Sequence, residues 1–395
     1  MKLHNNTIRG VHTALQAIFE EGQYADKVIE RTLKSNPKWG AKDRSFIAET
    51  TYEMVRWWRL IKHLSPSSNY WDLFGTYWIM QGHALPDWEE FERLHPEKIK
   101  GKYEAITDPG LLESIPEWLQ KLGSKELGEK WEPEIHALNE EAEVVLRVNT
   151  LKTTRERLKN RLADDGINTY IVKGYPDALI LEERQNVFRH PAFKEGLFEV
   201  QDASSQLVAA ALAVEPGMRV IDACAGAGGK SLHLAALMEN KGKVISMDVE
   251  EWKLQQAKLR ARRNGVSIFE PKVIEGTKTI KRLKESADRL LLDVPCSGLG
   301  VLRRNPDTKW KLSLESIEKV QQTQQEILQT YPSMLKKGGQ LVYATCSILP
   351  SENELQVKKF LESEAGKEFE LIEDKKVLAQ ESGFDGFYIA RLRKK

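Results

Sequence analysis

The chain of 395 residues has few of the features that mark specialised classes of protein. Its three cysteines include no C-x-x-C pair, which excludes a disulfide framework and a typical zinc motif. Its 59 basic and 58 acidic residues nearly cancel, so any surface for nucleic acid must be local. No apolar stretch is long enough to span a bilayer, and residues 1–6 lack the apolar core of a signal peptide. We therefore expect a cytoplasmic protein with no metal and no membrane partner, and take a monomer as the default.

Composition and periodicity divide the chain into three expected domains. Residues 1–138 favour helices, because apolar residues such as Leu15 and Ile18 recur at helical spacing, and eight of the ten tryptophans lie in this part. Residues 139–204 predict a small α/β module with several short strands. Residues 205–395 alternate strands and helices, as a doubly wound parallel sheet requires. The small module is either a linker or a binder of single-stranded RNA, although its strands carry few aromatic side chains for base stacking.

The most informative stretch runs from Val220 to Ser231. An apolar run ends at Asp222, a turn of small residues follows, and a helical pattern comes next. Small residues let the turn approach a ligand closely, and the first turn of the helix presents free N–H groups to it. The stretch misses the dinucleotide fingerprint by one glycine, at Ser231, and the phosphate loop by one glycine, at Cys224. Neither phosphate-binding motif is complete.

An adenosyl ligand without phosphates over the turn fits better. The strand expected at residues 243–248 ends in Asp248, whose carboxylate would bind ribose hydroxyls. S-adenosyl-L-methionine is therefore the expected cofactor. The residues of the turn expected to hold it are Cys224, Ala225, Gly226, Ala227, Gly228, Gly229 and Lys230.

Each of the three cysteines directly follows an apolar, strand-like run. Cys224, Cys296 and Cys346 would thus lie at the carboxyl ends of strands, where open parallel sheets bind their ligands. A single cysteine at such a position is most often a small buried apolar residue. Three cysteines at equivalent positions favour a chemical role.

Two thiols beside a methyl donor suit methylation of cytosine at C5. This carbon is a poor nucleophile until a thiolate adds to C6, and a second group can then assist the release of that thiolate. The residues alone leave open which of Cys296 and Cys346 attacks. Asp293, three residues before Cys296, could bind the base edge or the cofactor. A basic loop follows, with candidate RNA contacts at Arg303, Arg304 and Lys309 that could equally be solvated.

Several segments carry a family resemblance in their order and spacing. They are the glycine turn with Lys230, residues 293–298 (Asp-Val-Pro-Cys-Ser-Gly), residues 303–307, residues 345–347 (Thr-Cys-Ser), residues 146–149 and 200–205, and the tail at 385–387. Together they resemble the Sun/NSUN family of RNA cytosine-5 methyltransferases. Residues 43–56 are similar to the NusB-like helical domain of the bacterial RsmB branch.

The resemblance implies a Rossmann-like α/β methyltransferase domain, preceded by an all-α NusB-like domain and the small α/β module, that acts on small-subunit (16S) ribosomal RNA. It implies that Cys346 is the nucleophile and that Cys296 assists release, with Asp293 and Lys230 also catalytic. Asp248 and Asp293 would join the glycine turn in binding the cofactor. Where the family commonly has an acid after the third strand this chain has Gly276-Thr277, so Thr277 is included as a cofactor contact.

Three rival functions differ in class. A P-loop NTPase would explain Gly229-Lys230-Ser231, but Cys224 and Asp248 argue against it. An RNA-binding assembly factor without activity would need neither thiol. A methyltransferase for proteins or small molecules would leave the cysteine pair unexplained.

Overall fold

The computed structural model describes residues 3–395 and divides them into two compact units. The first unit holds the chain up to Glu140 together with the segment Leu302–Ser313. The second unit holds Glu141–Val301 and Leu314–Lys395. The three domain boundaries expected from the sequence remain predictions, but the membership of residues 302–313 in the first unit is a feature that no sequence pattern indicated.

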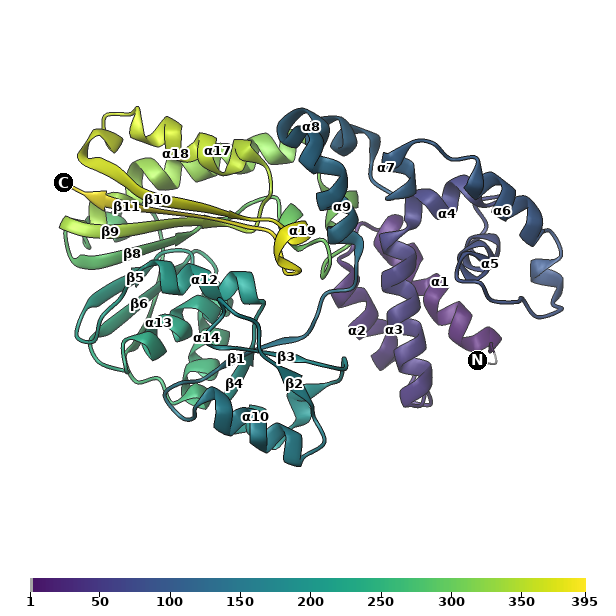
Figure 1. The fold of residues 1–395 in the computed structure, drawn as a ribbon, viewed down its shortest axis with the longest axis horizontal. Coiled ribbons are helices and arrows are strands. Elements are labelled where there is room, and N and C mark those ends of the chain that lie inside the picture. Colours follow the sequence, from purple (N-terminus) through teal and green to yellow (C-terminus); the bar gives the residue numbers. More distant parts are fainter. Residues whose placement is uncertain (1–2) are drawn as a thin grey trace. The chain divides into compact units, whose positions relative to one another are not determined.

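The first unit is helical (Figure 1). Its helices are α1 (Asn5–Phe19), α2 (Ala25–Ser35), α3 (Ala41–Arg56), α4 (Trp58–Leu64), α5 (Tyr70–Met80), α6 (Pro96–Glu104), α7 (Pro109–Leu112), α8 (Glu117–Leu127), α9 (Trp131–Asn139) and, from the later segment, α16 (Thr308–Lys311). Aromatic side chains fill its core, and the rings of Phe19 and Trp58 stack with their centroids 4.0 Å apart. Apolar residues also recur at helical spacing from Ile47 to Ile61, which predicts a second helix, but the structure divides this stretch between α3 and α4 at Trp57.

The second unit begins with a four-stranded antiparallel sheet in the order β2-β3-β1-β4. Its strands are β1 (Val145–Val148), β2 (Thr169–Tyr170), β3 (Ala178–Leu181) and β4 (Phe198–Val200), with helices α10 (Arg155–Asp164) and α11 (Pro191–Lys194) between them. Leu158 and Leu162 of α10 are buried against apolar side chains of the sheet, which gives this module its own small core. The strands and the helix predicted for this region are thus present.

A seven-stranded sheet forms the larger part of the second unit, in the order β10-β11-β9-β8-β5-β6-β7. Its strands are β5 (Arg219–Asp222), β6 (Lys243–Asp248), β7 (Phe269–Val273), β8 (Ala287–Asp293), β9 (Leu335–Thr345), β10 (Phe369–Val377) and β11 (Phe387–Lys394). The first five run parallel, whereas β11 pairs antiparallel with both β9 and β10. The predicted α/β class, with a helical part and a small module before the sheet, is confirmed.

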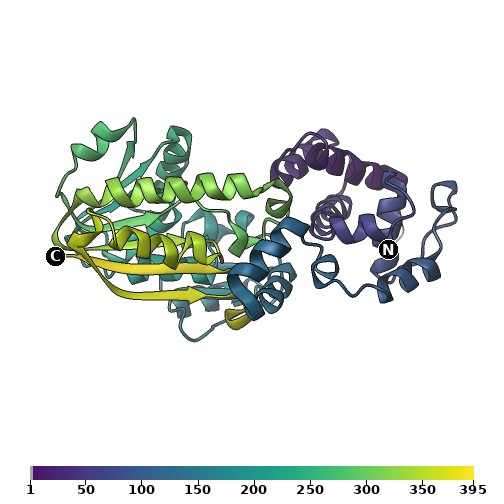
Figure 2. The same cartoon turned by 90° about the horizontal axis from the view of Figure 1, so that it is seen from above.

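Helices cover both faces of this sheet (Figures 1 and 2). One face packs against α12 (Ala203–Ala211), α13 (Gly229–Leu237) and α14 (Glu251–Asn264), and the other against α15 (Thr277–Lys281), α17 (Leu314–Thr330) and α18 (Glu354–Leu361). Figure 2 shows α17 and α18 side by side. Successive strand residues alternate between the two cores: Leu290 and Leu292 face one, Leu291 the other. Two buried faces explain the continuous apolar runs in the sequence.

The sequence predicts a glycine pair before the fifth parallel strand, a short third strand at Val273-Ile274 and a capping box at Ser351–Glu354, and the structure corrects all three. Gly338-Gly339, expected before the fifth strand, lie within β9, which already begins at Leu335. Val273 is the last residue of the third parallel strand and not its first, since β7 starts at Phe269. Ser351 does not open a capping box, because α18 begins only after Asn353, whose side chain makes no capping hydrogen bond, and Glu352 is buried. Burial of a charged side chain leaves no trace in a periodic pattern.

Across residues 3–395, no helix combines the length and apolarity that a bilayer crossing requires. The same residues contain no cluster of three or more His, Cys, Asp or Glu side chains arranged to hold a metal ion.

Candidate active site

The carboxyl ends of the parallel strands open onto one cavity of about 680 Å³. Its wall includes five of the residues predicted from the sequence: Cys224, Gly226, Asp248, Thr277 and Asp293. The strands β5, β6 and β8 deliver Cys224, Asp248 and Asp293 because each strand ends at or just before that residue. The sheet topology therefore gathers side chains that lie far apart in the chain, as expected.

The glycine turn after β5 is shaped by two residues with positive φ. Gly226 has φ 52° and Gly228 has φ 81°, in the left-handed region that favours glycine. A Cβ on Gly228 would also lie 2.7 Å from the Cβ of Ala257 on α14. The N–H of Gly226 donates to a carboxylate oxygen of Asp248 at 2.8 Å, so the acid after β6 fixes the turn as well as lining the cavity.

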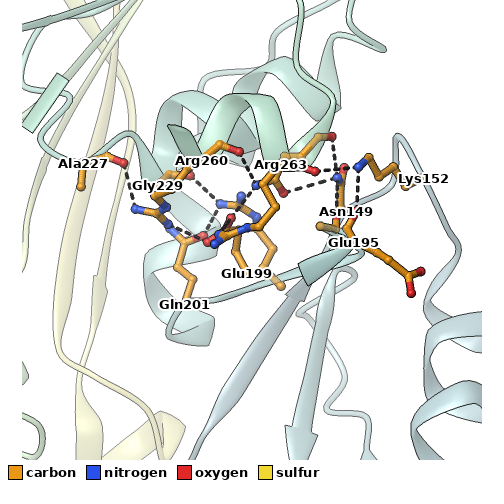
Figure 3. A network of polar contacts seen from close by, with 12 residues as sticks. Asn149, Lys152, Glu195, Glu199, Gln201, Ala227, Gly229, Arg260 and Arg263 are labelled. Carbon is orange, nitrogen blue, oxygen red and sulfur yellow. Dashed lines mark hydrogen bonds and ion pairs between the residues drawn. The ribbon is translucent and has the colours of Figure 1, made fainter. Parts of the chain in front are cut away.

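Polar side chains from the small sheet and from α14 hold two backbone carbonyls of this turn (Figure 3). Arg147 on β1 donates to the carbonyl of Gly229 at 2.6 Å. Arg260 on α14 donates to the carbonyl of Ala227 at 2.8 Å. Arg147 is buried, and burial lowers its pKa to about 10, which still leaves the guanidinium charged at neutral pH. The turn is therefore anchored to the four-stranded sheet as well as to its own strand and helix.

Glu199 of β4 neutralises the guanidinium groups of this network (Figure 3). Its carboxylate is 3% exposed and accepts from Arg260 at 2.9 Å, from Asn264 at 2.5 Å and from Arg263. Burial alone would raise the pKa of Glu199, but the two guanidiniums and the amide outweigh burial and lower it. The sequence offered no signal for this residue, because its partners lie on a helix far along the chain.

Lys230 and Asp293 form an ion pair beside the cavity. The ammonium nitrogen of Lys230, on the first turn of α13, lies 2.6 Å from a carboxylate oxygen of Asp293. Burial disfavours the charge on Lys230, but Asp293 outweighs burial and raises the pKa of Lys230. The ammonium also lies 5.4 Å from the centre of the Phe387 ring. Two predicted residues thus meet as one charged unit, with Lys230 13% and Asp293 24% exposed.

Cys296 and Cys346 face each other across the ends of β8 and β9. Their sulfur atoms are 3.2 Å apart, within hydrogen-bonding range for a thiol. The hydrogen bond with Cys346 and burial raise the pKa of Cys296 well above its usual value. Cys296 therefore stays protonated at neutral pH and can donate its S–H to the sulfur of Cys346. Cys224 is not part of this pair, and burial together with nearby acids raises its pKa as well.

A buried carboxylate that sequence reasoning missed lies behind the two thiols. Glu352 is fully buried, and it accepts hydrogen bonds from Ser297 and Ser347, the residues that follow the two cysteines. The Thr-Cys-Ser and Cys-Ser-Gly segments were conspicuous in the sequence, but the acid that joins them lies inside Ser351–Glu354, where the pattern predicted a capping box and gave Glu352 no role of its own. Only the serine that follows each cysteine could have hinted at a shared acceptor.

The basic loop predicted to contact RNA lies in the helical unit. Lys309 is 1% exposed, with its ammonium 3.3 Å from the side-chain oxygen of Asn139. Arg303 is 6% exposed and lies 3.6 Å from a carboxylate oxygen of Glu140. These two side chains are packed inside the protein and do not line a surface that RNA could reach, whereas Arg304 is half-buried. The burial of Arg303 and Lys309 therefore conflicts with the predicted direct contact with RNA. Their charge alone had suggested exposed side chains.

The cavity has the chemistry that an adenosyl ligand requires. The carboxylates of Asp248 and Asp293 offer acceptors for ribose hydroxyls and for an ammonium group. Ile274, Ile327 and Tyr331 supply apolar surface for a flat ring. Thr277, the replacement for an acidic residue, also lines the wall, and Glu275 stands beside it.

Two protein-family models match parts of this chain. Residues 209–393 match the family 16S rRNA methyltransferase RsmB/F, and residues 115–188 match the ferredoxin-like domain of RsmF/B-like methyltransferases. The second match starts in the expected helical domain and ends in the small α/β module.

Curated relatives agree with the family matches. The chain is 35% identical over 300 residues to a probable ribosomal RNA small subunit methyltransferase B of Synechocystis sp., an alignment that covers 71% of this chain and 67% of that protein. It is 38% identical over 287 residues to ribosomal RNA small subunit methyltransferase B of Escherichia coli, covering 71% and 66%. The chain thus spans about two thirds of the length of these relatives.

A solved structure extends the similarity to the helical part. The crystal structure of PH0851 aligns with 100% of both chains at a TM-score of 0.82 and 26% sequence identity. These findings confirm the family resemblance predicted from the sequence motifs. The chain belongs to the RsmB/F family of 16S rRNA methyltransferases, and S-adenosyl-L-methionine is its cofactor.

Proposed function

We propose that this protein methylates C5 of a cytidine in small-subunit ribosomal RNA through a covalent bond between Cys346 and C6 of the base. The observation that carries the proposal is the pair of thiols 3.2 Å apart, one of which directly follows Pro295 in the wall of the cavity. RNA as substrate is supported by the relatives, which are small-subunit ribosomal RNA methyltransferases. A protein or small-molecule methyltransferase would have no use for two facing thiols.

The chemistry begins with the nucleophile. The Cys346 thiolate forms a bond to C6, and the electron pair of the C5–C6 double bond moves to C5. The bound cofactor supplies an electrophilic methyl group on a positively charged sulfur. Held by the glycine turn, Asp248 and Asp293, the cofactor would supply this methyl group to C5 and would leave as the neutral thioether.

Release needs a base and a leaving group. The proton on C5 passes to a base, the C–H electron pair restores the C5–C6 double bond, and the bond from C6 to Cys346 breaks to return the thiolate. Cys296 assists this stage, because its sulfur lies next to that of Cys346. As a protonated thiol it donates a hydrogen bond that stabilises the departing thiolate.

Asp293 and Lys230 hold the base in the orientation required for attack. The Asp293 carboxylate accepts from the exocyclic amino group of cytosine, and the Lys230 ammonium, 2.6 Å from that carboxylate, fixes its position. A cytidine has to leave its stack to enter a site at the end of a sheet, so we expect loops to be better substrates than duplexes.

Single-turnover methylation of small-subunit ribosomal RNA with labelled S-adenosyl-L-methionine tests the proposal. Cys346→Ala should form no product and no covalent protein–RNA complex. Cys296→Ala should accumulate a complex that survives denaturing electrophoresis, because attack proceeds and release is slow. Thermal unfolding of both variants controls for loss of fold. Full activity in both folded variants would reject the two-thiol mechanism, and the opposite pattern would exchange the two roles.

A further inference from the structure

We propose that Glu352 is a positioning residue, which clamps the two cysteine-bearing loops together and so sets the distance between the reacting thiols. The role rests on the proposed function, since it matters only if both thiols act in one reaction. The proposal is based on the hydrogen bonds that Glu352 accepts from residues next to the two cysteines.

Each loop supplies donors to the same carboxylate. From the β8 loop, the backbone N–H of Ser297 donates at 2.7 Å and its hydroxyl at 2.5 Å. From the β9 loop, the hydroxyl of Ser347 donates to the oxygen that the Ser297 hydroxyl also contacts. The two hydroxyl oxygens are themselves 3.1 Å apart. Glu352 is thus the bridge between two segments that are 50 residues apart in the chain.

The bridge acts on the thiols through very short covalent connections. Ser297 follows Cys296 and Ser347 follows Cys346, and neighbouring Cα atoms are about 3.8 Å apart. A shift of either serine therefore moves the adjacent cysteine by a similar amount. Misplacement of a reacting group by about 1 Å can lower a rate about a hundredfold.

Further contacts keep Glu352 itself in place. The amide of Gln324 on α17 donates to its carboxylate at 3.2 Å, and the hydroxyl of Tyr343 donates to its backbone carbonyl at 2.7 Å. The neighbouring Asn353 donates to the carbonyl of Ser347 at 2.9 Å and accepts from Thr345 at 2.5 Å. All four groups donate to the carboxylate, the two N–H groups to one oxygen and the two hydroxyls to the other. An amide in its place would replace the shared hydroxyl acceptor with a donor, so both hydroxyls would have to turn and accept, and the charge-assisted hydrogen bonds would be lost.

The test is the distance between the thiols, measured without catalysis. A bifunctional thiol reagent of bimane type, which bridges two sulfur atoms only when they lie close together, is added to the folded full-length chain. Mass mapping of peptides assigns the bridge to Cys296 and Cys346. In Glu352→Gln we expect bridging to be at least about tenfold slower than in the wild type, because the two serine hydroxyls can no longer donate to one shared, charged oxygen.

Glu354→Gln is the matched control. It changes a glutamate two residues away that pairs with the exposed Lys376, and it should bridge at the wild-type rate. Single-turnover methylation should follow the same order, with a fall in the maximal rate of Glu352→Gln and little change in its apparent affinity for RNA. An unchanged bridging rate in folded Glu352→Gln would overturn the proposal.

The serines give a second route if Glu352→Gln does not fold. Ser297→Ala and Ser347→Ala each remove one hydroxyl of the bridge, and a double-mutant cycle measures whether their effects on bridging are coupled. Coupled effects support the clamp, and independent effects reject it. Because bridging needs no RNA and no methyl donor, the clamp can be confirmed even if the proposed reaction fails.

Discussion

Two buried glutamates in the second unit are held in opposite ways. Glu199 is 3% exposed and its acceptors face two guanidiniums, whereas Glu352 is fully buried and its acceptors face two serines, an amide and a backbone N–H. Burial raises the pKa of Glu352, and the neutral donors only partly offset it. At Glu199 the positive charges outweigh burial and lower the pKa. The partner, more than burial, decides how firmly a buried carboxylate stays charged.

The difference matches what each residue holds. Glu199 supports the glycine turn through Arg260. Charged partners keep this support in place over a wide range of pH. Glu352 joins two loops that carry thiols, and a full positive charge there would compete for the thiolate. Neutral donors hold the loops without placing a positive charge beside the thiols, and the Glu352 carboxylate itself contributes to the raised pKa of Cys296.

The largest effect on stability is expected at Glu199. Glu199→Gln removes the charge that two guanidiniums share, and it should lower the free energy of unfolding by about 2–3 kcal/mol, a value reduced because both guanidiniums are partly exposed. Urea unfolding measures it. Glu195→Gln, whose exposed carboxylate pairs with Arg161, is the control and should leave the midpoint unchanged. Equal midpoints for the two variants would remove Glu199 from the framework.

The two arginines that pair with Glu199 should differ in their effect on cofactor affinity. Arg260→Met releases the carbonyl of Ala227 in the glycine turn, and the dissociation constant for S-adenosyl-L-methionine should rise about tenfold, or roughly 1.4 kcal/mol. Arg263→Met breaks a pair with the same carboxylate but no contact with the turn, so its affinity should change far less. Isothermal titration calorimetry compares them, and equal losses would show that the network acts only through general stability.

The two glutamates should respond to pH with opposite sign. The lowered pKa of Glu199 contributes stability above its ordinary value of 4.5, and this contribution is lost as pH falls through the folded-state pKa. The raised pKa of Glu352 makes the folded state bind more protons, so its contribution falls as pH rises above 4.5. Unfolding free energies should therefore rise less steeply with pH below about 4.5 in Glu199→Gln, and more steeply above about 4.5 in Glu352→Gln, than in the wild type. Parallel curves would contradict the assigned partners.

The smallest effect is expected at Lys309, a buried amine beside an amide oxygen and an aromatic ring. Burial holds the pKa of Lys309 well below its usual value, so charging it in the folded state is costly. Lys309→Met should leave the free energy of unfolding at neutral pH within about 1 kcal/mol of the wild type or raise it. A loss greater than that, seen by urea unfolding, would mean that the contact with Asn139 outweighs the cost of burial.

Much of the cofactor side of the site was predictable because local sequence determines it. Apolar runs ending in Asp222, Asp248 and Asp293 identify parallel strands, and topology alone brings strand ends together. The meeting of Cys296 with Cys346 follows from the same rule, since β8 and β9 are neighbours.

The supporting groups were not predictable, because long-range packing decides them. The local pattern indicates a helix cap around Glu352, whereas its carboxylate is in fact taken up by the loops that follow β8 and β9. The local pattern likewise indicates an exposed cation at Lys309, although Asn139, 170 positions earlier, lies beside it. A run of charged residues indicates solvent exposure only when the whole segment lies at the surface. The periodicity of so short a segment does not show whether it lies there.

The segment 302–313 has a consequence for synthesis on the ribosome. Asp307 accepts from the N–H of Ala25, the indole of Trp310 donates to the carbonyl of Val55, and Arg56 donates to the carbonyl of Arg303, so the helical unit is completed by residues made long after its own helices. The first part of the chain to emerge therefore waits until residue 313 of 395 has left the exit tunnel before its interior is whole. During that interval the nascent helices lack the contacts that residues 302–313 supply. The helical unit therefore cannot finish folding before most of the second unit has been synthesised.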